Sequence, residues 1–242
     1  AAMLPYEDMR VAMAAAQSSS SGSEVEDTST DGRTTAGGFS FTISGKEATI
    51  TGYTGTMKDL AIPTKIKVTQ ENTSGGNTGG STQKPEKNEV EYAVVAIADH
   101  AFSGNLGIQK VTMSGGTDKD GKVFGLRTIG ERAFFACHDL ATVEIASTTT
   151  SIGKYAFTDC VALKSMKVAD GNTRYKVIDN ALYYYTSTPG TGEYTLIQYP
   201  LGDGAKEYKV PDAVTFTLTE VQEGAFWGSP SLENIVLPAT VK

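Results

Sequence analysis

The chain has 242 residues, enough for one or two domains with a substantial core. Apolar residues make up 39% and charged residues 20%, proportions that exclude a disordered polymer and a membrane bundle. The 21 basic and 28 acidic residues give a formal charge of −7, which repels phosphate backbones, so we expect no nucleic-acid partner. No stretch approaches the roughly 18 to 20 consecutive apolar residues of a membrane span, so we expect no membrane insertion.

The first 38 residues differ in composition from the rest of the chain. Residues 1–17 are rich in Ala and Met and could form a short helix. They do not fit a signal peptide, because Glu7 and Asp8 stand where positive charge belongs. Ser18–Gly38 is rich in Ser, Thr, Gly and acidic residues, the composition of a linker. We therefore predict a tail over 1–38, one domain over 39–242, and a chain without its own signal or anchor.

The predicted domain begins with a β-hairpin. Phe39, Phe41 and Ile43 alternate with small polar residues, Ser44 and Gly45 mark a turn, and the alternation resumes after it. Asn72–Ser81 is a low-complexity tract that predicts a flexible loop inserted in the domain. It does not match a phosphate-binding loop, because neither a helix pattern nor a Lys-Ser/Thr pair follows it.

Four segments of the chain repeat one pattern around an Ala-Phe pair. An apolar residue stands five positions before each Phe and six, nine and eleven positions after it. The adjacent copies around Phe134 and Phe157 are 23 residues apart, which predicts coils of about 23 residues. Met57, Leu60 and Ile62 fit the second half of the pattern and predict an earlier half-coil. The four phenylalanines are Phe102, Phe134, Phe157 and Phe226.

A period of this length with an LxxVxI pattern indicates a leucine-rich-repeat solenoid. The last two apolar positions of the pattern lie two residues apart, so they share one face of a strand that can pair with the next coil. The Phe side chains fill the interior opposite this strand. We therefore predict a mainly β fold, a right-handed solenoid stabilised by stacking of its coils.

These residues resemble the BspA-like leucine-rich-repeat family of bacterial surface proteins. The resemblance rests on IGxxAFxxCxxLxxVxI, clearest in Ile129–Ile145 and Ile152–Val168, and covers roughly residues 39–242. ITGYTG at Ile50–Gly55 and LAIP at Leu60–Pro63 resemble the family's lead-in to its first coil. Arg174–Pro200 resembles the family's tyrosine-rich unit, an inserted β-hairpin.

The repeat and the missing catalytic constellation predict a protein without enzymatic activity. The resemblance implies an exported protein, extracellular or on the bacterial cell surface. It implies adhesion to host or neighbouring cells through an extracellular protein or glycan partner. The alternative is a structural spacer within a larger surface protein, with no ligand of its own. The sequence leaves the oligomeric state open.

The cysteines and histidines offer little support for catalysis or metal binding. Cys137 and Cys160 occupy equivalent positions in adjacent coils, where Asn105 and Ser229 stand in two other copies. We predict reduced, buried thiols, although the strand spacing alone permits a disulfide. Cys137 should point inward and His138 outward, against a Cys-His nucleophile. We predict no catalytic residue, no metal site and no cofactor, and interpret His100 and His138 as surface residues.

Gly116–Val123 comes close to two known loops without matching either. Val123 stands where a phosphate-binding loop needs Ser or Thr, and Gly116 stands where a calcium loop needs its first carboxylate. An insertion hairpin between coils is the better interpretation.

Two surfaces are candidates for partner binding. One is tyrosine-rich, because seven of the eleven tyrosines fall between Tyr175 and Tyr208, and alternation along Tyr183–Tyr185 should leave at least one ring exposed. The alternative is that the other rings close the hairpin against the solenoid. The other is the ladder of positions between the apolar strand residues, although a merely solvated sheet face fits this ladder as well. The candidate tyrosines are Tyr183, Tyr184, Tyr185 and Tyr194, and the candidate ladder residues are Lys110, Thr112, Thr142, Glu144, Ser165 and Lys167.

Overall fold

The computed structural model describes residues 24–71, 87–185, 192–211 and 217–242. Within these ranges the chain forms nineteen β-strands joined by turns, and no α-helix. The fold is therefore mainly β, as predicted. The predicted helix in residues 1–17 and the predicted loop over 72–81 lie outside the described residues.

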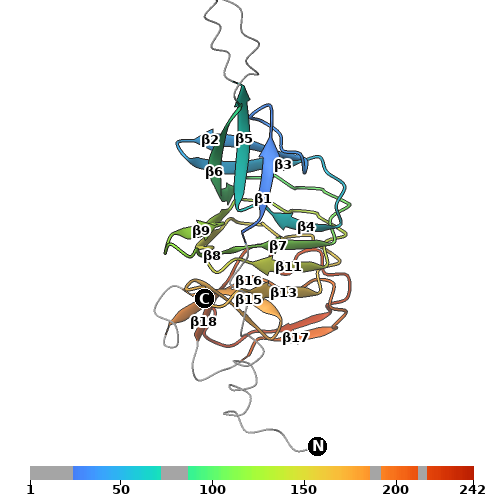
Figure 1. The fold of residues 1–242 in the computed structure, drawn as a ribbon. Helices are drawn as coiled ribbons and strands as arrows, with labels where there is room; N and C mark the ends of the chain where they lie inside the picture. Colours follow the sequence, from blue (N-terminus) through green and yellow to red (C-terminus); the bar gives the residue numbers. More distant parts are fainter. Residues whose placement is uncertain (1–23, 72–86, 186–191, 212–216) are drawn as a thin grey trace, which may run out of the picture.

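The N-terminal part is a seven-stranded mixed sheet in which β6 is the central strand (Figure 1). The first half of β6 pairs antiparallel with β5, and its last residues pair parallel with β3 and β10. Strands β2 and β3 form the predicted hairpin, with Phe41 opposite Ile50. The strands of this sheet are β1 (Glu26–Ser29), β2 (Phe39–Ser44), β3 (Glu47–Tyr53), β5 (Lys65–Glu71), β6 (Lys87–Ile97), β10 (Thr128–Ile129) and β12 (Ser151–Ile152).

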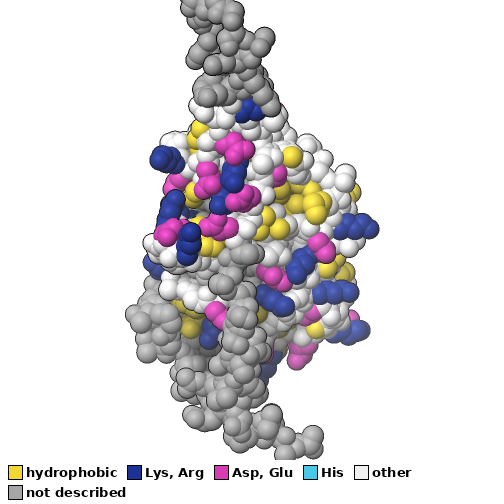
Figure 2. Space-filling view, in the orientation of Figure 1, with side chains coloured by type: hydrophobic (Ala, Val, Ile, Leu, Met, Phe, Trp, Pro, Cys, Tyr) yellow, Lys and Arg dark blue, Asp and Glu magenta, His cyan; other side chains and the backbone are white. Residues whose placement is uncertain are grey.

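Strand β1 lies inside the segment whose composition predicts a linker. It pairs parallel with β5 from Glu26 opposite Lys65 to Ser29 opposite Val68. The reason is charge complementarity, because the Lys65 ammonium contacts the carboxylates of Glu24 and Glu26. Figure 2 shows acidic and basic side chains intermixed over this part of the molecule. The linker prediction is therefore wrong for these residues, since their acidic side chains are partners of β5 lysines.

A second sheet carries the repeat, and all of its strands run parallel, one beneath another in Figure 1. Thr142 lies opposite Ser165 in the register, an offset of 23 residues. The half-coil predicted at Leu60 and Ile62 also joins this sheet, with Leu60 opposite Val111. The strands are β4 (Asp59–Ile62), β7 (Lys110–Met113), β11 (Thr142–Ile145) and β13 (Ser165–Val168).

The chain between Ser114 and Leu126 forms the insertion hairpin that the sequence predicts. Strand β8 (Gly115–Thr117) pairs antiparallel with β9 (Val123–Gly125). The Asp118 carboxylate accepts the backbone N–H groups of Asp120 and Lys122 and so closes the turn. This carboxylate is a turn-forming group.

The tyrosine-rich segment forms a third sheet. Its first three strands pair antiparallel in chain order, and β16 then pairs parallel with β18. Strands β17 and β19 form a separate, short parallel pair. The strands are β14 (Tyr175–Ile178), β15 (Ala181–Tyr185), β16 (Glu193–Gln198), β17 (Glu207–Lys209), β18 (Thr217–Val221) and β19 (Asn234–Val236).

The repeated phenylalanines stack on one another in the interior. The ring centroids of Phe102 and Phe134 are 4.8 Å apart with an interplanar angle of 5°, and those of Phe134 and Phe157 are 5.5 Å apart at 9°. All three side chains are buried. Phe226 does not continue this stack, because it packs on Tyr199 and Tyr208 in a separate core cluster.

The turn around each Phe repeats an unusual backbone conformation. The residues two before and two after the Phe adopt positive φ, a region that costs about 1–2 kcal/mol for residues other than glycine. At two of these positions the neighbouring turn approaches closely, because a Cβ on Gly224 or Gly228 would lie within 3 Å of side-chain atoms of that turn. The residues with positive φ are His100, Gly104, Arg132, Ala136, Tyr155, Asp159, Gly224 and Gly228.

Candidate functional site

The outward face of the parallel repeat sheet carries the predicted ladder. Thr142 lies between Lys110 and Ser165 in the register, and Glu144 lies between Thr112 and Lys167. The alternate positions of the same strands point inward, so Val111, Val143 and Met166 are buried. Strand β4 adds Asp59 and Ala61 to the two rows. The structure thus brings all six predicted ladder residues onto one face, and their role in binding stays a prediction.

The ladder face is polar and carries both signs of charge. The Lys110 ammonium lies 3.0 Å from a Glu144 carboxylate oxygen, a diagonal pair across neighbouring strands. Exposed pairs of this kind contribute at most about 1 kcal/mol to stability. Figure 2 shows basic and acidic side chains interspersed where Figure 1 draws these strands. The face therefore offers hydrogen-bonding groups and spaced charges to a ligand that lies across several strands.

The predicted tyrosine-rich surface is mostly buried in the structure. Tyr183, Tyr185 and Tyr194 are at most 5% exposed, and Tyr184 is half-buried. The Tyr183 and Tyr208 hydroxyls lie 2.7 Å apart in a buried hydrogen bond. The assignment of Tyr183, Tyr185 and Tyr194 to a binding surface is therefore wrong.

The reason is that strand β15 has a core on each of its faces. Leu182 and Tyr184 pack in the cluster that contains the phenylalanine stack, whereas Ala181, Tyr183 and Tyr185 belong to the second cluster. Strand alternation does send the rings to opposite sides, but neither side is solvent. The unbroken apolar run from Ala181 to Tyr185 is the signal of a strand buried on both faces.

Both cysteines are free and buried, as predicted. The Cys137 thiol donates to the Phe102 carbonyl and the Cys160 thiol to the Phe134 carbonyl, each at 3.1 Å. Burial raises the pKa of Cys137 to about 12, so its thiolate is scarce at neutral pH. These thiols tie each coil to the one before it and are poor nucleophiles.

In the other two copies, the residues that replace the cysteines also form hydrogen bonds within the turn. The Asn105 side-chain oxygen accepts the backbone N–H groups of Gly107 and Ile108. The Ser229 hydroxyl accepts the N–H of Leu232 at 3.3 Å. The position therefore selects a small side chain that can hydrogen-bond to nearby backbone.

Both histidines lie on the surface, as predicted. His138 Nε2 is 3.1 Å from an Asp159 carboxylate oxygen, whereas the neighbouring Cys137 thiol is bonded to the Phe102 carbonyl. The two neighbours therefore do not form a nucleophile pair. In the described part of the chain, no three His, Cys, Asp or Glu side chains gather into a group that could hold a metal ion.

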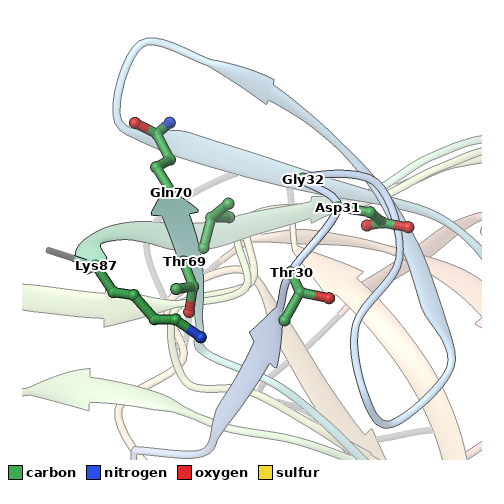
Figure 3. Close-up of a pocket in the computed structure, with 7 residues that line it drawn as sticks. Thr30, Asp31, Gly32, Thr69, Gln70 and Lys87 are labelled. Carbon is green, nitrogen blue, oxygen red and sulfur yellow. The ribbon is translucent and has the colours of Figure 1, made fainter. Parts of the chain in front are cut away.

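A polar hollow of about 550 Å³ lies where β1 ends beside β5 and β6 (Figure 3). Lys87 and Thr69 point into the space near Thr30, whereas the Asp31 carboxylate points away. Asp31 accepts the backbone N–H groups of Arg33 and Thr34, and this hydrogen bonding holds the pKa of its carboxyl below its usual range. The lining offers the Lys87 amine, the hydroxyls of Thr30 and Thr69 and the Gln70 carboxamide, while the Asp31 carboxylate is engaged by backbone N–H groups.

Within the described residues there is no helix with the length and hydrophobicity of a membrane span.

Comparison with known proteins identifies the repeat. Residues 96–189 match the family described as "BspA type Leucine rich repeat region", in six copies. This match includes the coils around Phe102, Phe134 and Phe157 and the start of the tyrosine-rich segment. No curated protein matches the chain.

Several solved structures are similar to parts of the chain. A leucine-rich repeat protein from Eubacterium ventriosum is 19% identical at a TM-score of 0.46, over 62% of this chain and 34% of its own. One from Bacteroides capillosus is 26% identical at 0.41, over 56% of this chain and 81% of its own. A leucine-rich cell surface protein from Faecalibacterium prausnitzii is 19% identical at 0.34, over 85% of this chain and 76% of its own.

The chain spans about a third of the length of the Eubacterium ventriosum protein. The family match covers the same turns, stacked rings and parallel strands that the structure shows. Residues 96–189 of this chain are therefore a leucine-rich repeat region of the BspA type.

Proposed function

We propose that the chain is an exported, non-enzymatic surface protein that binds an extracellular protein or glycan with its ladder face. The observation that carries this proposal is the register of the repeat sheet, which aligns outward polar residues of successive coils in two rows. A rigid array of this kind places its groups at the spacing of β-strands, about 4.8 Å, without ordering cost on binding. A right-handed solenoid with coils of about 23 residues fits the offset between Thr142 and Ser165.

Adhesion to host or neighbouring cells is the role that this surface supports best. The likeness of the repeat to the BspA type and the polar, mixed-charge ladder both fit recognition of an extended extracellular ligand. The described residues hold no metal cluster, and the described cysteines are buried, so binding without covalent chemistry is the simplest use of the face.

The proposal is tested by surface capture of the whole chain on arrays of extracellular matrix proteins and glycans. Lys167→Glu changes an exposed charge in the ladder and should weaken binding of any ligand found by about tenfold, or about 1.4 kcal/mol. The matched control is Lys122→Glu, which makes the same charge change in the exposed turn of the β8–β9 hairpin. Equal weakening by both variants, or blank arrays, would contradict binding through the ladder.

A spacer within a larger surface protein is the second candidate, and one observation favours it. Ile235 and Leu237 are 38% and 43% exposed, whereas their repeat equivalents Val143 and Ile145 are at most 1% exposed. A further coil stacked on β19 would bury them. Blank arrays, together with detection of this chain within a longer polypeptide on the cell envelope, would support the spacer.

A further inference from the structure

The turns that contain the Ala-Phe pairs form a continuous surface between the two columns of parallel strands. The backbone N–H of Ala136 donates to the Thr158 carbonyl, which joins two successive turns. A Cβ on Gly224 would lie 2.7 Å from the Thr158 hydroxyl, and one on Gly228 would lie 2.5 Å from Asp159. The turn of Phe226 therefore sits directly on the turn of Phe157, although 69 residues separate them.

One large aromatic side chain stands out from this surface into solvent. Trp227, the single tryptophan of the chain, is 62% exposed. Its ring meets Phe135 edge to face, at a centroid distance of 6.3 Å and an angle of 71°. Thr158, at the equivalent position of the intervening coil, is small and buried. Trp227 thus reaches past one coil to form an aromatic pair with the next.

Charged and aromatic residues of the same turns also contact one another. The Arg132 guanidinium lies 4.7 Å from the centre of the Tyr155 ring and 2.7 Å from a Glu131 carboxylate oxygen. The nearby Glu223 carboxylate raises the pKa of the Tyr155 hydroxyl. In these turns the carboxylates of Asp99, Glu131, Asp159 and Glu223 outnumber the cations Arg132 and Lys154, so the surface has a negative border.

We propose that this turn surface, formed by Trp227, Phe135, Tyr155 and Arg132, docks a protein that offers an apolar hollow bordered by lysine or arginine. Tryptophan, tyrosine and arginine are the residues that most often dominate binding energy in protein interfaces. The projecting Trp227 ring is removed from water most completely when it inserts into an apolar hollow of the partner. The negative border favours lysine or arginine around that hollow.

A glycan fits these observations less well than a protein. A neutral glycan would gain nothing from the negative border, whereas a basic rim on a protein would pair with it. The turn surface is separate from the ladder face, so this inference goes beyond the proposed function. If the turn surface does not bind, the proposal of binding through the ladder face still stands, because the two proposals are tested with different variants.

The test titrates the whole chain with short amphipathic peptides of leucine and lysine, and of leucine and glutamate, while following Trp227 fluorescence. The leucine-lysine peptide should shift the emission to shorter wavelength and bind at least about tenfold tighter than the leucine-glutamate peptide. By calorimetry, Trp227→Ser should weaken this binding by about 30-fold, the effect of a hot-spot residue. Phe135→Ala is a second variant and should weaken binding by about fivefold.

The control is Val123→Ser, which removes an apolar side chain that is 64% exposed on the β8–β9 hairpin. It should bind the peptide within about twofold of the unchanged chain, as should Lys167→Glu. Circular dichroism checks that each variant folds. Equal binding by Trp227→Ser and the unchanged chain would overturn the proposal, since attraction to the net negative charge would then explain it. An emission shift with neutral oligosaccharides but with neither peptide would also overturn it, in favour of a glycan.

Discussion

The phenylalanine stack and the tyrosine-rich unit build similar turns from different chemistry. The backbone N–H of Phe134 donates to the Ala156 carbonyl, and that of Tyr199 donates to the Ala225 carbonyl in the same way. Tyr199 thus takes the place of a repeat Phe, although its own sequence context has no Ala-Phe pair. Coil geometry is therefore set by backbone pairing, which accepts either ring.

The two regions differ in what their rings require. Phe134 is satisfied by apolar contact alone, stacked between two rings. The tyrosine hydroxyls need partners when buried. Tyr183 bonds to Tyr208, Tyr199 donates to the Asp203 carboxylate, and Tyr175 accepts the N–H of Ile152. The tyrosine-rich unit is therefore the polar, pH-sensitive part of the core.

The largest expected effect that tests this comparison is Phe134→Ala. It should lower the free energy of unfolding by about 3–5 kcal/mol, because the ring is fully buried and leaves a cavity in the middle of the stack. Phe226→Ala should cost less, about 1–3 kcal/mol, because that ring is only partly buried. Urea unfolding followed by circular dichroism measures both. Equal losses would show that the two clusters share one core.

The next effect is alkaline destabilisation of the tyrosine-rich unit. Burial raises the pKa of Tyr175 and of Tyr208 to about 12, against about 10 in the unfolded chain. Because the folded pKa is the higher one, the neutral hydroxyls contribute fully below about pH 10, and their contribution is lost as pH rises towards about 12. Each could account for up to about 3 kcal/mol.

Urea unfolding at a series of pH values measures this loss, and Tyr208→Phe should make the stability curve flatter between about pH 10 and 12. In the same pH range, hydrogen exchange should show that β15 and β16 lose protection before β11. If the unfolding free energy of Tyr208→Phe fell with pH as steeply as that of the unchanged chain, the loss would not come from the buried tyrosines.

The smallest effect concerns the turn backbone. Ala136→Gly should raise stability by about 0.5–1 kcal/mol, because Ala136 has φ 55° and glycine adopts this conformation without strain. Ala133→Gly in the same turn is the matched control. It should lower stability by about 1 kcal/mol, since Ala133 is fully buried and lies outside the positive-φ positions. Thermal unfolding of both variants checks the opposite signs.

Periodic positions were predictable, because they depend on neighbours at fixed offsets. The strands at Val111, Val143 and Met166 and the half-coil at Leu60 follow from spacing alone. The buried thiols follow from the spacing together with the small residues that replace cysteine in two other copies. The surface of Phe135 and Trp227 was not predicted. Its signal was the large aromatic that follows the Ala-Phe pair in two of the four copies, but only the stacking of turns distant in the chain brings the two rings together.

The repeat, its parallel strands and its apolar interior follow from the amino-acid sequence, since a regular period forces equivalent residues into equivalent environments. Which faces remain in water depends on packing between distant segments. The apolar run of β15 signals burial on both faces, but the residues that form its two cores, like the β5 lysines that hold β1, are distant in the chain. Burial is a property of what covers a strand, and here the covering residues are distant in the chain.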